Sequence, residues 1–262
     1  GMSTDKSREI VAQYSEQYSF ILLLVNQIRI VPYAMNIGIE ASKGNIIIRL
    51  DAHTYYQNDY FSVLTRRLVE LKADNIGTVC KTDVLNKTPK TLAIREVLSN
   101  KFGVGNSIFR TGLFGIKDVD TVPFGCWKRE VFDNYGLFDV RLVRNQDIEL
   151  NKRIRRNGGK ILLISESFCT YFVRETFTAL AKNNYGNGKW NILTVFYTGE
   201  LRSLSLRHFV PLLFVLGLFF PCVVGIFWHS AFVISLFVVG MYFLLIGSVS
   251  VYLAISNYLN VC

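Results

Sequence analysis

The chain has 262 residues, of which 50% are hydrophobic and 14% aromatic, and its formal net charge is +9. This composition excludes a disordered or fibrous protein, because such chains lack the apolar side chains that a packed core needs. The average hides a division, since all 29 Lys and Arg residues and all 20 Asp and Glu residues precede residue 208. We therefore expect a basic, water-soluble domain over residues 1–207 and an uncharged apolar tail over residues 208–262.

Hydrophobic spacing predicts an alternation of helices and strands within the first 207 residues. In chain order, helices are expected over residues 7–18, 33–42, 59–72, 128–135 and 147–157, and strands over 20–25, 45–50, 76–82, 121–126 and 160–165. Residues 91–110 contain two Gly residues, Gly103 and Gly105, and fit neither period. Strands that alternate with helices favour an α/β domain whose sheet is largely parallel, at least in its first half.

The tail contains two apolar stretches, residues 208–228 and 231–255. Each is long enough to cross the hydrocarbon core of a bilayer as a helix. A pair of buried core helices is the alternative, but a globular core seldom needs so long a run without charge. Pro and Gly within the stretches do not oppose a membrane location, where helices tolerate both. We expect a transmembrane hairpin that turns at residues 228–230.

The flank of the first stretch indicates its orientation. The basic residues before it are Lys182, Lys189, Arg202 and Arg207, opposed by Glu200. The positive-inside rule then places the water-soluble domain in the cytoplasm. No signal peptide is predicted at the start of this sequence. The five Cys residues lack metal-ligand or pairing spacing, so free thiols are expected.

Two sets of acidic residues are candidates for chemistry. Asp51 and His53 directly follow the strand predicted at 45–50, and ligands of α/β sheets bind beyond the carboxyl ends of strands. A carboxylate and an imidazole at this spacing can reach one cation, although an acid at a strand end is also a common turn former. Asp147 and Glu149 open a predicted helix, where acids also complement the helix dipole.

The geometry of a helix separates the roles of these two helical acids. Positions two apart differ by about 200° around the axis. If Asp147 points into a cleft, Glu149 faces away, and it could then pair with Arg153 at i+4.

The order of motifs resembles the family 2 glycosyltransferases, which are inverting enzymes with the GT-A fold. The motifs that carry the resemblance are GMSTDKS (1–7), AMNIGI (34–39), RLDAH (49–53), FGC (124–126) with KREVF (128–132) and GLFD (136–139), QD (146–147) and GKW (188–190). The RLDAH, GVGNS (103–107) and VPFGC (122–126) segments are most similar to succinoglycan-type exopolysaccharide transferases. Those enzymes elongate a lipid-linked oligosaccharide at the bacterial cytoplasmic membrane.

The resemblance assigns roles to residues of this chain. It implies that Asp147 is the catalytic base and that Asp51 with His53 holds a divalent cation, Mn²⁺ or Mg²⁺. The residues implied to bind the donor nucleotide are Asp5, Asn36, Arg49 and Asp51, and those implied to bind the acceptor are Gly125, Gln146, Lys189 and Trp190. Trp190 has a second interpretation as an aromatic anchor at the membrane interface.

Three features depart from the family pattern. The sequence starts inside the first motif, so we expect an N-terminally truncated GT-A domain that lacks its first strand, and activity of this polypeptide alone is in question. His53 stands where a second acid is expected, which weakens the cation site. The GKW segment is a loose counterpart of the Q-x-x-R-W element, which favours addition of single sugars over processive synthesis.

The sequence thus predicts a multi-pass bacterial inner-membrane enzyme. It would transfer a sugar, with inversion, from a nucleotide-diphosphate donor (a UDP-sugar) to a lipid-linked saccharide in exopolysaccharide or surface-glycan synthesis. A non-catalytic, membrane-anchored nucleotide-sugar-binding protein and a nucleotide-sugar hydrolase are the alternatives. Nucleic acid is not an expected partner, because the cations are scattered rather than clustered with aromatic residues.

Overall fold

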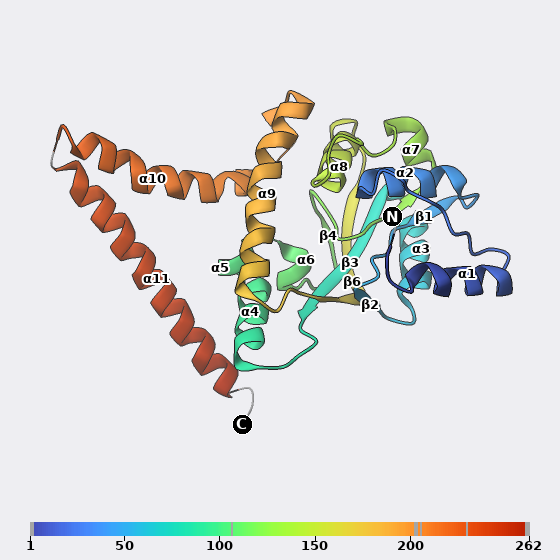
Figure 1. Cartoon of the computed structure of the whole chain (residues 1–262), viewed down its shortest axis with the longest axis horizontal. Helices are drawn as coiled ribbons and strands as arrows, with labels where there is room; N and C mark the ends of the chain where they lie inside the picture. The colour runs from blue at the N-terminus through green and yellow to red at the C-terminus, as the bar shows by residue number, and fades with distance from the viewer. Residues whose placement is uncertain (1–2, 106, 202–203, 205, 229, 260–262) are drawn as a thin grey trace.

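The computed structural model describes residues 3–105, 107–201, 204, 206–228 and 230–259. Figure 1 shows an α/β domain from which two long apolar helices project. Several residues named above lie outside the described part of the chain, among them Gly1, Met2, Asn106, Arg202 and Cys262.

A six-stranded mixed sheet forms the centre of the domain. Its strands are β1 (Ile46–Ile48), β2 (Thr54–Tyr56), β3 (Asn75–Asp83), β4 (Ile116–Asp118), β5 (Cys126–Lys128) and β6 (Ile161–Phe172), in the order β1-β5-β3-β6-β2 with β4 also paired to β6. β3 and β6 are parallel, and the other observed pairings are antiparallel. The expectation of a largely parallel sheet is therefore wrong. Strands that alternate with helices suggest parallel strands joined by crossover connections. β5, however, lies between β1 and β3 and runs antiparallel to both.

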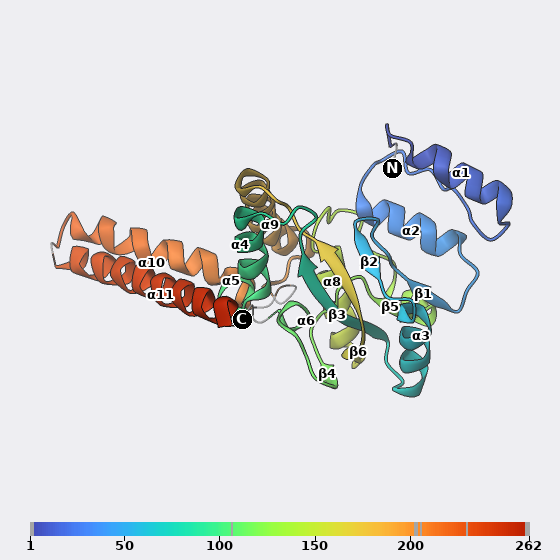
Figure 2. The same cartoon turned by 90° about the horizontal axis from the view of Figure 1, so that it is seen from below.

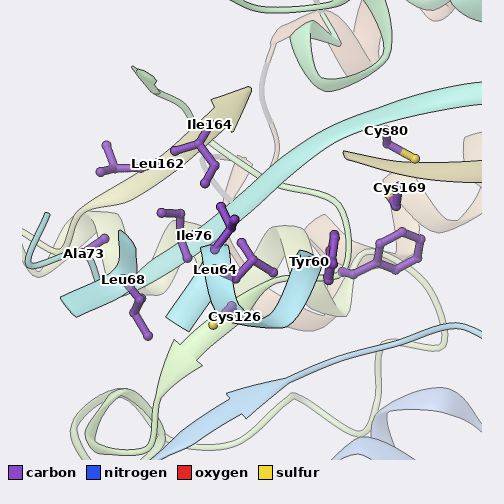
Figure 3. Close-up of a cluster of buried hydrophobic side chains, with 12 residues drawn as sticks. Tyr60, Leu64, Leu68, Ala73, Ile76, Cys80, Cys126, Leu162, Ile164 and Cys169 are labelled. Atoms are coloured by element: carbon purple, nitrogen blue, oxygen red, sulfur yellow. The ribbon is translucent and has the colours of Figure 1, made fainter. Parts of the chain in front are cut away.

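Helices cover both faces of this sheet. The helices described before the tail are α1 (Ser7–Gln17), which buries none of its side chains, α2 (Val31–Ala41), α3 (Tyr60–Glu70), α4 (Pro89–Ser99), α5 (Lys101–Val104), α6 (Ile108–Thr111), α7 (Glu130–Tyr135), α8 (Gln146–Arg156) and α9 (Phe177–Thr198). α3 packs on one face through Tyr60, Leu64 and Leu68, which are fully buried (Figure 3). Burial of each such side chain contributes about 1.5–3 kcal/mol. α2, α7 and α8 pack on the other face.

The period of two along a strand explains the two cores. On β6, Leu162 and Ile164 point toward α3, whereas Ile161 and Leu163 point toward α8. The first four residues of β6 are therefore all apolar and buried, as expected where a strand is covered on both faces. β3 and β6 form the centre of the sheet. Polar side chains lie at the carboxyl ends of these two parallel strands.

Two strand predictions differ from the structure. Residues 20–25 form no strand, and Phe20 and Leu22 are 80% and 63% exposed. A short apolar run is stable as a strand only when a sheet edge supplies hydrogen-bond partners, and no described strand pairs with this one. The strand predicted at 121–126 begins only at Cys126, because Phe124 and Gly125 adopt positive φ values. Residues 91–110, which were unassigned, contribute to α4, α5 and α6.

The apolar tail folds as α10 (Val210–Gly225) and α11 (Ala231–Leu259), preceded by the 3-10 turn Leu206–Phe209. In α11, residues Ala231–Ile255 have a mean hydropathy of 2.4 and are long enough to span a membrane. α10 has 16 residues, or about 24 Å at 1.5 Å per residue, which is shorter than the hydrocarbon core. The two helices pack together where Ser235 donates to the carbonyl of Leu218 at 3.0 Å. A membrane crossing by α10 stays a prediction.

Candidate active site

The loop after β1 places Asp51 beside Arg49. The guanidinium of Arg49 donates from Nε to Asp51 Oδ1 at 3.0 Å and from Nη2 to Oδ2 at 3.2 Å. The Arg49 and Asp51 side chains are 14% and 24% exposed. This two-point pairing is strong because donor and acceptor are both charged. Asp51 therefore has a partner already, and a cation would have to share or replace it.

Backbone contacts hold this loop against the sheet. The Asp51 amide donates to the hydroxyl of Tyr56 at 2.7 Å, and the Arg49 amide donates to the carbonyl of Gly125 at 3.2 Å. The Tyr56 ring packs edge-on against Phe124, with 5.8 Å between centroids. Burial raises the pKa of Tyr56. Gly125, which was predicted to bind the acceptor, thus positions the backbone that carries Asp51.

Gly125 is required at its position for two reasons. Its φ is +91°, a conformation that side chains disfavour, and a Cβ there would lie 2.3 Å from a ring carbon of Trp127. Trp127 itself is 1% exposed and packs against Phe132 and Phe138. The turn at Gly125 therefore depends on close contact between backbone and indole.

His53 lies two residues further, at the surface. Its ring packs edge-on against Tyr171 of β6, with 4.9 Å between centroids. Within the described residues, no group of three or more His, Cys, Asp or Glu side chains is arranged to hold a metal ion. A cation at this loop would therefore also need ligands from the phosphates of the nucleotide donor, because Mg²⁺ is usually held by one or two carboxylates together with substrate phosphates. Asp51 can supply one such carboxylate.

The second cluster lies at the start of α8. Asn145 adopts a left-handed conformation with φ of 64°, and its Nδ2 donates to Asn191 Oδ1 at 3.0 Å and to Thr194 Oγ1 at 3.1 Å. The neighbouring Arg144 donates to Asn183 Oδ1 at 3.0 Å and to Asn187 Oδ1 at 2.6 Å. The turn that precedes Asp147 is thereby fixed to α9.

These asparagines are functional candidates that sequence reasoning missed. Asn183, Asn187 and Asn191 occur at successive i, i+4 positions, so they share one face of α9. The same helix carries Lys189, which is exposed, and Trp190, which is half-buried. A polar stripe at helical spacing was the signal that could have found them. α9 therefore contacts the turn that precedes Asp147, the proposed base, and also carries two of the proposed acceptor residues, Lys189 and Trp190.

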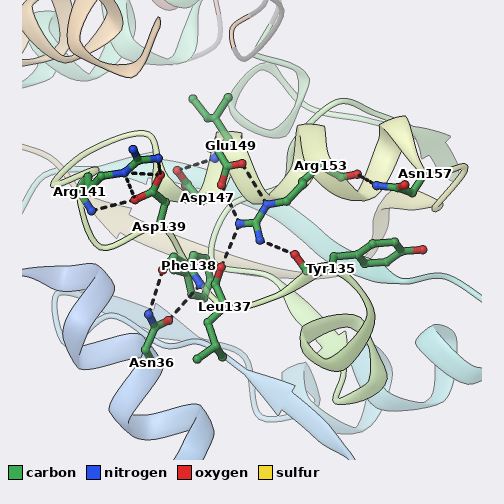
Figure 4. Close-up of polar contacts among 11 residues, drawn as sticks. Asn36, Tyr135, Leu137, Phe138, Asp139, Arg141, Asp147, Glu149, Arg153 and Asn157 are labelled. Carbon is green, nitrogen blue, oxygen red and sulfur yellow. Dashed lines mark hydrogen bonds and ion pairs between the residues drawn. The ribbon is translucent and has the colours of Figure 1, made fainter. Parts of the chain in front are cut away.

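Glu149 and Asp147 differ in their surroundings. Arg153 donates to Glu149 from Nε at 3.0 Å and from Nη2 at 2.7 Å, and it also donates to the carbonyl of Leu137 at 2.9 Å (Figure 4). The predicted i+4 pair is confirmed. Asp147 Oδ1 accepts only the adjacent amide of Ile148, at 2.9 Å, and no salt bridge to it is found among the described residues. Asp147 therefore keeps a half-buried carboxylate that is available to a substrate.

Two further predicted residues, Gln146 and Trp190, have other surroundings. The buried Gln146 side chain, 6% exposed, has its Oε1 without a described hydrogen-bond donor. The Trp190 ring stacks on Tyr197, with centroids 6.5 Å apart and an angle of 27° between planes. Arg141 lies 5.9 Å over the same Tyr197 ring and pairs with Asp139, which lowers the pKa of Asp139. An aromatic and charged surface thus lies beside the start of α8.

Asn36 and Asp5 contact protein groups rather than an open site. Asn36 Nδ2 donates to the carbonyl of Phe138 at 2.9 Å, while its Oδ1 accepts the Phe138 amide at 3.0 Å (Figure 4). Asp5 accepts the Ser7 amide at 3.1 Å at the start of α1, and hydrogen bonding by the Ser7 side chain and by this amide lowers the pKa of Asp5. Both side chains have structural contacts, and nucleotide binding by either stays a prediction.

Comparison with known proteins identifies the family. Residues 1–136 match the family described as glycosyl transferase family 2. The succinoglycan biosynthesis protein ExoA of Rhizobium meliloti is 28% identical over 191 residues, which are 72% of this chain and 57% of that protein. A dolichyl N-acetyl-α-D-glucosaminyl phosphate 3-β-D-2,3-diacetamido-2,3-dideoxy-β-D-glucuronosyltransferase of Methanococcus voltae is 24% identical over 222 residues, 78% of this chain and 68% of that one.

Among solved structures, the chain has a low similarity to a mannosyltransferase. The mannosyltransferase PcManGT of Pyrobaculum calidifontis, in complex with GDP-Man and Mn²⁺, has a TM-score of 0.46 and 16% sequence identity, and the match covers 67% of this chain and 47% of that one. This similarity is too low to assign any residue or ligand here. The family match covers more than half of the sequence, and the domain is an α/β domain with a mixed sheet. The chain therefore belongs to glycosyl transferase family 2 and has the GT-A fold.

Proposed function

We propose that the chain transfers a sugar from a nucleotide-diphosphate donor, with UDP-sugars as the expected donors, to a lipid-linked or saccharide acceptor. The observation that carries the proposal is the Asp147 carboxylate, which belongs to a half-buried residue, lies outside the Glu149–Arg153 pair and follows a turn that Asn145 fixes to α9. The similarity to ExoA supports a role in exopolysaccharide or surface-glycan synthesis.

The reaction would be a single displacement with inversion. Asp147 accepts the proton of an acceptor hydroxyl as the oxygen bonds to the anomeric carbon, and the bond from that carbon to the diphosphate breaks with its electron pair. A positioned carboxylate within hydrogen-bond reach is suited to this role. A divalent cation held by Asp51, with His53 nearby, would supply Lewis-acid stabilisation of the leaving diphosphate. Arg49 adds a fixed positive charge at the same loop.

Acceptor binding would use the surface beside α9. Trp190 and Tyr197 offer stacked rings for a sugar face, Lys189 is an exposed cation, and Gln146 has an amide oxygen without a described donor. Because Gln146 is buried, acceptor binding by its unpaired Oε1 would require this side chain to become accessible, and a sugar hydroxyl that then donates to it would remove the cost of leaving it unpaired.

Membrane attachment is part of the proposal. α11 would cross the bilayer, with α10 packed beside it, and the domain over residues 1–207 would remain on the cytoplasmic side of a bacterial inner membrane. The length, hydropathy and 6% burial of the apolar segment in α11 support an anchor. Exposed Lys182 and Lys189 on α9 support the orientation.

A non-catalytic binding protein is the second candidate. The observation that favours it is the pairing of Asp51 with Arg49, which occupies the proposed cation ligand. Product analysis of the full chain in detergent, with UDP-sugar and Mn²⁺, separates the candidates. Sugar on a lipid-linked acceptor supports transfer, free sugar without acceptor indicates hydrolysis, and unchanged donor with measurable UDP binding indicates the binding protein.

A further inference from the structure

A pocket of about 380 Å³ lies at the carboxyl end of β3, outside the residues described above. Its lining includes Lys81 and Asp83 of β3, Arg95 and Ser99 of α4, and Arg110 of α6. Three side chains with permanent positive charge thus converge where polar side chains emerge from the centre of the sheet. Such a position suits an anionic ligand.

Two of these positive charges are uncompensated. Arg95 lies 3.9 Å from Asp83 and also pairs with Glu96 at 2.7 Å. Among the described residues, Lys81 and Arg110 make no salt bridge. Lys81 Nζ lies 3.4 Å from the centre of the Phe168 ring, and Arg110 Cζ lies 5.4 Å from that of Tyr171. The rings hold both cations in place while leaving N–H groups free to donate.

The other side of α4 faces the membrane helix. An apolar groove of about 330 Å³ lies between α5 and α11 and is lined by Val97, Phe102 and Leu245 among others. Positions 95 and 97 differ by about 200° around a helix, so the cationic pocket and the groove lie on opposite sides of α4. They approach at its end, where Ser99 lines the pocket and Asn100 the groove. Figures 1 and 2 both show the end of α11 returning to α4.

We propose that the cationic pocket binds the phosphate or diphosphate group of the lipid-linked acceptor, and that the groove receives the first part of its hydrocarbon chain. This inference rests on the proposed function and names the acceptor site. The charged head group would match the cationic pocket, and the apolar chain would match the groove, which is the cavity lined by the membrane helix α11. Tyr171 contacts both Arg110 and His53, so the bound head group would lie one aromatic ring away from the loop that carries Asp51.

Equilibrium binding to the full chain in nanodiscs tests the head-group site, with farnesyl diphosphate, inorganic diphosphate and UDP as probes. Lys81→Gln and Arg110→Gln are each expected to weaken both farnesyl diphosphate and inorganic diphosphate about tenfold, close to 1.4 kcal/mol. Lys101→Gln is the matched control, because it removes an exposed cation of α5 that does not line the pocket. It should leave both affinities unchanged, and UDP affinity should stay constant in all three variants.

A second variant separates the groove from the pocket. Phe102→Ser removes an exposed ring at the groove, so farnesyl diphosphate should bind more weakly while inorganic diphosphate is unaffected. A loss of UDP affinity in Arg110→Gln equal to that for farnesyl diphosphate would assign the pocket to the donor and overturn the proposal. Unchanged diphosphate affinity in both cation variants would overturn it as well. None of these measurements needs turnover, so a chain that transfers no sugar could still pass or fail them.

Discussion

Replacing Asp147 by Asn separates catalysis from binding at one residue. The amide is isosteric with the carboxylate and can still accept the Ile148 amide at 2.9 Å, so the start of α8 should keep its geometry. The variant loses the ability to take a proton from the acceptor hydroxyl. A positioned general base contributes about 10²–10⁴-fold, which corresponds to roughly 2.7–5.4 kcal/mol of the barrier. We expect turnover to fall by that factor while UDP affinity is unchanged.

Glu149→Gln is the matched control, two positions along the same helix. Its carboxylate pairs with Arg153, and the two side chains are 14% and 27% exposed. Arg153 would keep its bonds to the carbonyls of Tyr135 and Leu137. Loss of one partly buried charge should cost about 1–3 kcal/mol of stability. The expected result is a lower Tm with most of the activity retained.

The assay measures initial rates and UDP affinity for both variants of the full chain in detergent, together with thermal unfolding. Loss of turnover in Glu149→Gln with full activity in Asp147→Asn would show that the opposite face of α8 meets the substrate. Small, equal losses in both would show that neither acid is the base. Either result would refute the reasoning from helix geometry and from the Glu149–Arg153 pair.

Three other changes test the remaining parts of the site. Gly125→Ala should lower stability by about 3 kcal/mol in thermal unfolding, because its Cβ would lie 2.3 Å from the Trp127 ring at a φ of +91°, and an unchanged Tm would contradict this. Asp51→Asn should abolish Mn²⁺-dependent UDP binding in calorimetry, leave Arg49 without its carboxylate and preserve the fold, whereas undiminished binding would exclude Asp51 as a ligand. A reporter fused after Cys262 should be cytoplasmic, because both apolar helices are predicted to cross the membrane as a hairpin, and an exported reporter would show that only α11 crosses it.

Rules that use only residues close together in the sequence predicted several helices and one side-chain pair correctly. The helices at α1, α2, α3 and α8 follow from apolar spacing, and the Glu149–Arg153 pair follows from i+4 geometry. These features depend on residues close together in the sequence, for which the spacing of side chains is fixed by the helix itself.

Features that depend on distant segments were not predictable in this way. The direction of β5 depends on its neighbours β1 and β3, which periodicity does not specify. The motif that contains Asn36 gives a residue type, but not that both polar atoms of its amide bind the Phe138 backbone. The contacts of Arg129 could not be predicted either. Its guanidinium donates to the carbonyls of Ser42 and Gly44 and thereby caps the end of α2.

α9 connects the two halves of the proposed mechanism. Asn191 accepts a hydrogen bond from Asn145, next to the proposed base, and its Nδ2 donates to the carbonyl of His208 at 3.3 Å, where the tail begins. Thr194, which is fully buried, accepts a second bond from the same Asn145. One face of one helix thus contacts both the turn before Asp147 and the start of the apolar hairpin. Because these contacts are direct hydrogen bonds, α9 fixes the turn before Asp147, the proposed base, relative to the start of the apolar tail.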